Sequence, residues 1–138
     1  MTDTLVDSNV LIDIFADDPQ WKVWSLHQLL RARGEGRLVI NPLIYAEISS
    51  AFPTQRRLDE ALGPERYYRE DLPWEAAFNA GRAFLAYRRA GGIKRSPLPD
   101  FYIGAHAEVK DYALLTRDLA RYRGAFPTLK IVSPETHP

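Results

Sequence analysis

The chain has 138 residues, of which 46% are hydrophobic and 26% are charged, and its formal net charge is zero. This length and composition predict one soluble globular domain, residues 1–138, that buries about two thirds of the surface of its unfolded chain. The absence of cysteine excludes disulfides, thiolate metal sites and cysteine nucleophiles. No apolar run is long enough to span a bilayer and no basic-then-apolar leader opens the chain, so we expect a cytoplasmic protein without a membrane partner.

The first quarter of the chain predicts one strand and two helices. Leu5 and Val6 form a short buried strand that ends at Asp7 and leads directly into a helix at residues 10–15. A second helix ends at Gly34. Its aliphatic residues recur on one side at the helical period, namely Val23, Leu26, Leu29 and Leu30.

The middle of the chain predicts a second buried strand, Leu38–Ile40, and two helices, the second of which stops at Gly63. Residues 67–72 are a weak strand candidate of mixed polarity, better suited to the edge of a sheet. The clearest helix follows and ends at Gly91. Residues at steps of three and four show the helical period of this segment: Trp74, Ala77, Phe78, Gly81, Leu85 and Arg88.

The last third begins with a basic, proline-stiffened loop at residues 94–99 and a helix at residues 100–107 whose small side chains permit close packing. Two further strands are predicted at residues 113–116 and 129–132. Strands that alternate with helices pair in parallel through right-handed crossovers. We therefore predict an α/β fold, a three-layer α/β/α domain with a short parallel central sheet.

Four acidic residues from distant parts of the chain are expected at one edge of this sheet. Asp7 ends the first strand, and Asp118 follows another strand by two residues. Glu47 lies in the first turns after the second strand, and Asp100 opens the helix that leads to residues 113–116. Because the carboxyl ends of the strands form the ligand crevice of such a sheet, the four carboxylates should converge.

Convergence of four carboxylates at one edge has an electrostatic cost. Two carboxylates about 5 Å apart repel by about 3 kcal/mol at an effective dielectric constant of about 20. Four of them cannot all stay ionised without raised pKa values or a bound cation. Mg²⁺ prefers oxygen ligands and keeps positions open for substrate phosphates, so the predicted site suits metal-assisted hydrolysis of a phosphodiester bond.

The acids lie in three motifs: Val6-Asp7-Ser8-Asn9-Val10-Leu11-Ile12-Asp13, Leu98-Pro99-Asp100-Phe101-Tyr102-Ile103-Gly104-Ala105-His106-Ala107 and Leu114-Leu115-Thr116-Arg117-Asp118. With Glu47 in mid-chain, these motifs resemble in order and spacing the PIN-domain ribonucleases, and within them the VapC-type toxins of bacterial toxin–antitoxin pairs. The closing segment, residues 122–131, fits the same group. The resemblance covers nearly the whole chain.

This resemblance implies an endoribonuclease that depends on Mg²⁺ or Mn²⁺ and leaves 5′-phosphate and 3′-hydroxyl ends on RNA. It also implies inhibition by a cognate antitoxin, in a homodimer or a toxin–antitoxin hetero-oligomer. Asn9 and Thr116 occupy positions where the family often has polar support. The catalytic and metal-binding positions of the family fall on Asp7, Glu47, Asp100 and Asp118.

Basic and aromatic residues are candidates for binding the partners. Trp21 and Trp24 lie off the aliphatic stripe of their helix and mark either an antitoxin groove or the periphery of the core. Basic residues near Asp100 form either an RNA-phosphate site or solvated helix ends. These residues are Arg88, Arg89, Lys94, Arg95 and Arg117.

The acids and one histidine also have structural alternatives. Asp7 and Asp100 could be helix N-caps, and Asp118 could cap a short helix after it. Asp13 faces away from the expected site and should be solvated. His106 lies six residues from the start of its helix, off the face of the first acid, so a structural hydrogen bond is favoured over a role as general base.

Other functions compete with the nuclease. A phospho-accepting signalling domain also uses Mg²⁺ at the carboxyl ends of its strands, and Thr116 matches one of its parts. It needs an acceptor aspartate after the third strand, where Asp71 sits in a doubtful strand. A non-catalytic RNA-binding or scaffold protein of the same fold would not require the complete acid set. A haloacid-type phosphatase would require aspartate where Asn9 stands.

Overall fold

The computed structural model describes residues 1–91 and 98–138. Within them, the strands form one parallel sheet in the order β3-β2-β1-β4-β5. The strands are β1 (Thr4–Val6), β2 (Leu38–Ile40), β3 (Tyr67–Arg69), β4 (Ala113–Leu115) and β5 (Ile131–Val132). All five predicted strands are present and pair in parallel, although β3, β4 and β5 are shorter than predicted, and β3 lies at an edge of the sheet as expected.

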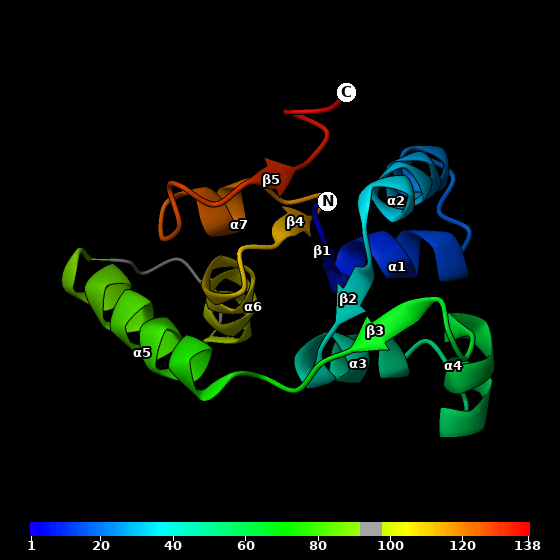
Figure 1. The fold of residues 1–138 in the computed structure, drawn as a ribbon, viewed down its shortest axis with the longest axis horizontal. Coiled ribbons are helices and arrows are strands. Elements are labelled where there is room, and N and C mark those ends of the chain that lie inside the picture. Colours follow the sequence, from blue (N-terminus) through cyan, green and yellow to red (C-terminus); the bar gives the residue numbers. More distant parts are fainter. Residues whose placement is uncertain (92–97) are drawn as a thin grey trace.

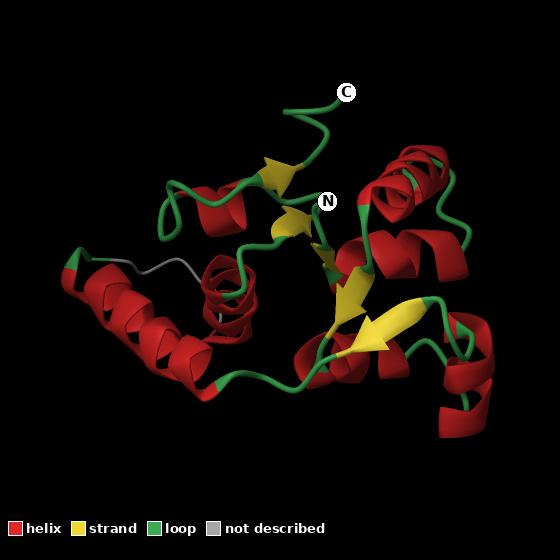
Figure 2. Ribbon diagram, in the orientation of Figure 1, coloured by secondary structure: helices red, strands yellow, loops and turns green. Residues whose placement is uncertain are grey.

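Helices cover both sides of this sheet. They are α1 (Ser8–Phe15), α2 (Lys22–Glu35), α3 (Pro42–Ser49), α4 (Gln55–Leu62), α5 (Trp74–Arg89), α6 (Leu98–Val109) and α7 (Ala120–Arg123). Figure 1 shows α1 and α2 on one side and α5, α6 and α7 on the other, while α3 contacts both α1 and α6. Figure 2 shows the same arrangement by element type, which confirms the three-layer architecture. Among the described helices, none is long and apolar enough to cross a membrane.

The central strands are short and entirely buried. Every residue of β1, β2 and β4 is buried, as expected of parallel strands that are covered on both faces. In β3 only Tyr67 is buried, because this strand has a neighbour on one side alone. The continuous apolar strands therefore fix the middle of the sheet, and polar residues begin where these strands end.

The register of β1 against β4 places the first acid. Val6 pairs with Leu115, so the next residue of each strand, Asp7 and Thr116, leaves the sheet on the same edge. The amide of Asp7 donates to the carbonyl of Leu115 at 2.9 Å, which extends the ladder by one residue. The start of α1 is thereby held beside the loop that follows β4.

The buried face of α2 differs from the one that its aliphatic stripe suggested. Leu29 is buried, but α2 also buries Ser25 and Gln28. The hydroxyl of Ser25 donates to the buried carboxylate of Asp13 at 2.8 Å, and this bond turns the polar side of α2 toward α1. The other residues of the stripe are exposed, namely Val23, Leu26 and Leu30.

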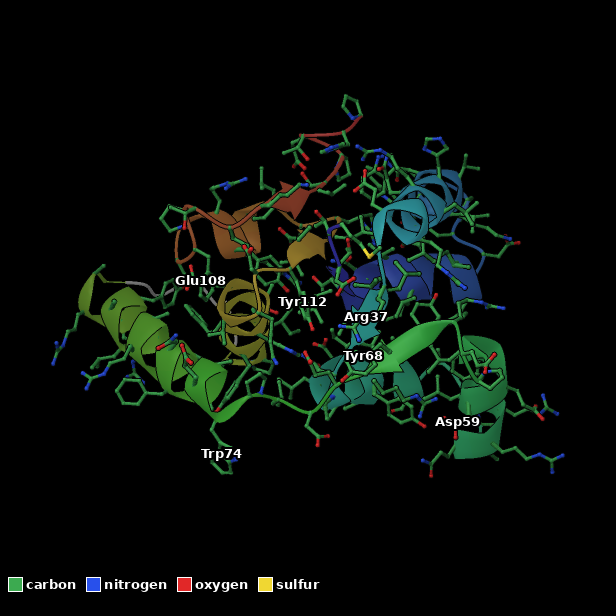
Figure 3. The ribbon with its side chains drawn as sticks, viewed as in Figure 1. Arg37, Asp59, Tyr68, Trp74, Glu108 and Tyr112 are labelled. Carbon is green, nitrogen blue, oxygen red and sulfur yellow. The ribbon has the colours of Figure 1, made fainter. Side chains whose placement is uncertain are left out.

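Small residues form the first part of the core-facing side of α5, and Phe84 and Tyr87 continue it. Ala76 and Ala80 are fully buried, and α5 packs against α6 along its length. Alanine at these positions lets the two helix backbones approach closely. The bulky residues from which the helix was predicted lie on the outside. Trp74 is 91% exposed, and Figure 3 shows it pointing away from the ribbon at the start of α5. Phe78 and Leu85 are exposed as well.

Gly104 lets α6 pack closely against the ring of Phe126. A Cβ atom at this position would overlap the ring of Phe126, coming within 2.5 Å of Cδ2. Gly104→Ala is therefore expected to lower the free energy of unfolding in urea by about 1–3 kcal/mol, the usual cost of overpacking. Gly81→Ala on α5, where a Cβ meets nothing within 4 Å, is the control and should be neutral or slightly stabilising. Equal stability of the two variants would contradict the packing of α6 against Phe126.

Candidate functional site

Hydrogen bonds from three parts of the chain hold Asp7 in one orientation. Its Oδ2 accepts from Thr116 Oγ1 and from Tyr122 Oη, each at 2.8 Å, and its Oδ1 accepts from the Ser8 amide at 2.8 Å. The last bond makes Asp7 the N-cap of α1. Capping and a place in the predicted site, which were alternatives for Asp7, are therefore compatible. Burial raises the pKa of Asp7, although the bonds from Thr116, Tyr122 and Ser8 act to lower it.

Asn9 and Thr116 lie against this acid. The amide of Asn9 donates to Thr116 Oγ1 at 3.3 Å and lies 3.5 Å from Asp7 Oδ2. Asn9 Oδ1 accepts from the amide of Arg117 at 3.1 Å, and Thr116 Oγ1 accepts from the amide of Asp118 at 3.1 Å. These bonds join the start of α1 to the loop after β4, so the two side chains stand where polar support was expected.

Asp100, in the first turn of α6, keeps one carboxylate oxygen without a partner. Its side chain is 3% exposed, its Oδ1 lies 3.8 Å from Arg121 Nη1, and its Oδ2 makes no hydrogen bond. Burial raises the pKa of Asp100 to about 6, the positive charge of Arg121 opposes this, and the negative charges of Asp7, Glu47 and Asp118 add to it. Burying a carboxylate oxygen without a hydrogen-bond partner costs folding free energy, and a bound ligand at Oδ2 would recover that cost.

Glu47 and Asp118 approach the same edge from two other elements. Glu47 lies on the exposed side of α3, yet its Oε1 accepts from Ser8 Oγ at 2.9 Å, so the carboxylate reaches the first turn of α1. Burial and the charge of Asp7 raise the pKa of Glu47, while the bond from Ser8 lowers it. Asp118 is partly exposed and pairs with Arg121 Nε at 2.8 Å.

Arg121 and Tyr122 were missed as site residues. Arg121 contacts both Asp100 and Asp118; burial acts to lower the pKa of its guanidinium, but these two carboxylates raise it. Tyr122 is fully buried and bonds to Asp7. The sequence signal for Arg121 is its position three residues after Asp118, a spacing of opposite charges too common to stand out alone.

The four acids fit a hard divalent cation by charge and by ligand chemistry. Their charges act on one another, all four supply oxygens, and the Oδ2 atom of Asp100 is unpaired. Among the described residues, no three Asp, Glu, His or Cys side chains are drawn closely enough to form a finished metal site. Arg121 instead supplies part of the balancing charge.

Asp13 and Arg117 form a buried ion pair. Asp13 is 2% exposed, and it accepts from Arg117 Nε at 2.7 Å and Nη2 at 3.0 Å. The ring of Trp21 lies 5.2 Å from the guanidinium carbon. The expectation that Asp13 is solvated is wrong, because α2 folds back over α1 and covers it. The RNA-binding role of Arg117 stays a prediction, and its guanidinium already has a structural partner.

The remaining candidates lie at the surface or outside the described residues. Arg88 and Arg89 are exposed in the last turn of α5. Lys94 and Arg95 fall outside the described residues. Trp21 and Trp24 are half-buried and meet edge to face, with ring centroids 6.4 Å apart, and the indole nitrogen of Trp24 donates to the carbonyl of His137 at 2.7 Å.

His106 is buried at the junction of α6, α3 and the segment after β3. Its Nδ1 lies 2.9 Å from Asn41 Nδ2, and its Nε2 lies 2.7 Å from Glu70 Oε1. Because Asn41 Oδ1 accepts from the Ile44 amide, Asn41 Nδ2 is the donor to Nδ1, which leaves the proton on Nε2 for Glu70. Burial lowers the pKa of His106 against the raising effect of Glu70, so the ring is neutral. These bonds agree with the structural role favoured for His106.

The raised pKa of Asp100 predicts a stability that depends on pH. The folded state holds this proton up to about pH 6, whereas the unfolded state releases it near the ordinary value of 3.8, so the carboxyl destabilises the fold as pH rises through this window. In metal-free buffer, Asp100→Asn should therefore raise the Tm more at about pH 8 than at about pH 4.5. The pKa of Asp59 is lowered by its bonds from Tyr45 and Arg69, so Asp59→Asn should give no such gain. A gain from Asp100→Asn that is equal at both pH values would contradict the electrostatic coupling.

Comparison with known proteins gives a family and a fold. A family model described as PIN domain matches residues 4–126. A search of the curated proteins finds no match. Similar solved structures include VapBC2 from Rickettsia felis bound to a DNA fragment from its promoter, with a TM-score of 0.72 and 17% identity over 95% of this chain and 98% of that chain. DNA-bound VapBC from Salmonella typhimurium gives a TM-score of 0.71 and 21% identity over 96% and 98% of the two chains. FitAcB from Neisseria gonorrhoeae gives 0.67 and 18% over 98% and 99%.

Proposed function

The chain belongs to the PIN-domain family, and from this premise we propose that it is the toxin of a toxin–antitoxin pair, a metal-dependent endoribonuclease that hydrolyses RNA phosphodiester bonds. The observation that supports this most strongly is the set of coupled acids at the carboxyl edge of the sheet, in which buried Asp100 keeps an unpaired oxygen. Four acids from four elements at one edge have no structural explanation in common, whereas a bound dication accounts for all of them.

The residues proposed to hold one or two Mg²⁺ or Mn²⁺ ions are Asp7, Glu47, Asp100 and Asp118. When bound, such an ion would polarise the phosphate and lower the pKa of a coordinated water molecule, which favours its attack on phosphorus. The chain supplies orientation. Thr116 and Tyr122 fix one oxygen of Asp7, and Ser8 joins the other oxygen to the carboxylate of Glu47.

Incubation of the purified protein with total cellular RNA tests the activity. We expect cleavage with Mg²⁺ or Mn²⁺ and none after chelation, and the cut sites, mapped by sequencing of the 5′-phosphate ends, would define the RNA. Absence of cleavage on all cellular RNA with either metal would count against a nuclease and would favour the non-catalytic alternative.

Manganese is expected to stabilise the folded protein, because an ion that binds only the folded state shifts the unfolding equilibrium. At about 100 times its Kd the gain is about 2.7 kcal/mol, which corresponds to a rise in Tm of several degrees. The double variant Asp7→Asn/Asp100→Asn should lose this shift. The control Asp17→Asn/Asp59→Asn removes two carboxylates that pair with Lys22 and Arg69 away from the site, and it should keep the shift. Equal shifts in both double variants would place the ion elsewhere.

We also propose that the chain binds a cognate antitoxin. The assembly would be either a homodimer of this chain or a hetero-oligomer of toxin and antitoxin. Val23, Leu26 and Leu30 form the exposed aliphatic stripe of α2, and the half-buried rings of Trp21 and Trp24 lie at the start of this helix, off the stripe. Together they offer a surface on which an amphipathic helix could bury its apolar face. Co-purification with the product of a short neighbouring reading frame would test this partner, and failure of the two products to associate would contradict it.

A further inference from the structure

Among the residues that the structure describes, Arg121 is the basic side chain that pairs with two of the four acids. Its Nε lies 2.8 Å from Asp118 Oδ2, and its Nη1 lies 3.8 Å from Asp100 Oδ1. The side chain is 48% exposed, so the guanidinium sits at the rim of the site. The contact with Asp100 is longer than a hydrogen bond, and it leaves the other oxygen of that carboxylate without a partner.

This arginine also lies at a groove between α5, α6 and α7. The cavity has a volume of about 380 Å³, and its walls are mostly alanine, with Tyr87 and Phe101 at α5 and α6. Arg121 is the one charged side chain among the described residues that line it. The acid site and the groove therefore meet at this guanidinium, which can face either of them.

We propose that Arg121 is a displaceable counterion: it pairs with Asp100 and Asp118 until a dication takes these carboxylates, and the released guanidinium then holds an RNA phosphate at the mouth of the groove. This inference rests on the function proposed above and adds a role for a residue outside the acid set. In this role the Arg121 guanidinium binds two anions in turn, first a carboxylate and then a phosphate, and guanidinium forms strong hydrogen bonds to both.

Two ion pairs of this chain show why the exchange is feasible at Arg121. Arg117 makes two short bonds to Asp13, which is buried, so its release would leave an uncompensated charge in the interior. Arg121 is half exposed and makes one short bond, to an acid that is itself 39% exposed. Exposed pairs contribute little to stability, so a dication can replace this one at small cost.

The test compares Arg121→Gln with Arg69→Gln. Arg69 is 47% exposed and pairs with Asp59 at 2.9 Å, so the control removes an arginine of equal exposure and pairing away from the site. By isothermal titration, Arg121→Gln should bind Mn²⁺ roughly three- to tenfold more tightly than the parent, because the competing charge is gone. Its affinity for a labelled single-stranded RNA should fall several-fold, because a phosphate contact is lost. The RNA is measured by fluorescence anisotropy with Ca²⁺ in place of Mg²⁺ and checked on a gel to be intact.

Opposite changes in the two affinities distinguish this role from a structural one, which would weaken both. If the parent binds Mn²⁺ and RNA but Arg121→Gln does not bind the ion more tightly, or does not bind RNA more weakly, the inference is overturned and the proposed function stands. A parent that binds neither overturns both. A measurement on the unmodified chain adds an independent check: Mg²⁺ should shift the ¹⁵N resonance of Arg121 Nε and leave that of Arg69 unchanged, and no shift at Arg121 would overturn the inference.

Discussion

Asp7→Asn is expected to lower kcat/KM for RNA cleavage by at least about a hundredfold while the chain still folds. Partners outside a metal's ligand set already cost about 10- to 100-fold when they are replaced, so the loss of a charged ligand should cost at least as much. Asp7 is the acid whose orientation is most fully determined, with both oxygens bonded. An asparagine keeps the shape and an acceptor for the Ser8 amide, so the N-cap of α1 persists.

The matched control for this prediction is Asp59→Asn. Asp59 accepts hydrogen bonds from Tyr45 and Arg69, so this variant also removes a bonded carboxylate charge. It lies on α4, away from the start of α1, as Figure 3 shows. Its cleavage rate should stay within about twofold of the parent, since surface changes away from a site have small effects. Rates are compared at saturating Mn²⁺ after circular dichroism confirms both folds; parental cleavage by Asp7→Asn would remove Asp7 from the mechanism.

The convergence of acids at one sheet edge was predictable because it depends on topology alone. Asp7 and Asp118 each lie within three residues of a strand end, and Asp100 lies in the first turn of a helix that returns to the next strand. In a parallel sheet these positions fall on the same edge whatever the side chains do. The family model over residues 4–126 agrees with the fold predicted on this basis.

The side chains that complete the site depend on tertiary packing. Tyr122 reaches Asp7 across 115 positions of sequence, and nothing in its neighbours indicates this bond. Asp13 was misjudged for the same reason, because its burial is decided by how α2 crosses α1. Strand order is also invisible in the sequence: Asp71 follows β3, which β2 separates from β1, so the acceptor position of a signalling domain would lie away from Asp7.

Helical period identified α2 and α5 but not their buried faces. In α5 the bulky residues Trp74 and Phe78 share a period with the small residues Ala76 and Ala80, and hydrophobicity favours the bulky face. The structure turns Ala76 and Ala80 toward the core, and Phe84 and Tyr87 farther along α5 pack on Phe101 of α6. Close packing between two helices cannot be inferred from either helix alone, and this accounts for the error.

Arg117→Ala is expected to lower the free energy of unfolding by about 2–4 kcal/mol. Breaking a buried ion pair by removing one partner typically costs about 3–5 kcal/mol, because the remaining charge is left without compensation. Asp13 is 2% exposed, but Arg117 keeps 30% of its side chain in contact with solvent, and this places the expected cost toward the lower end. After the change, Ser25 is the side chain still bonded to the Asp13 carboxylate.

Urea denaturation of three variants separates the loss of the pair from the loss of arginine itself. Arg69→Ala removes an exposed partner and should cost no more than about 1 kcal/mol. Asp13→Asn/Arg117→Ala removes both charges, so it should be more stable than Arg117→Ala alone, although it has lost one more ionic group. That reversal is the signature of a buried charge left unpaired. If the double variant were less stable than the single one by the full cost of a second lost contact, Asp13 would have to be reached by solvent, and the packing of α2 over α1 would be refuted.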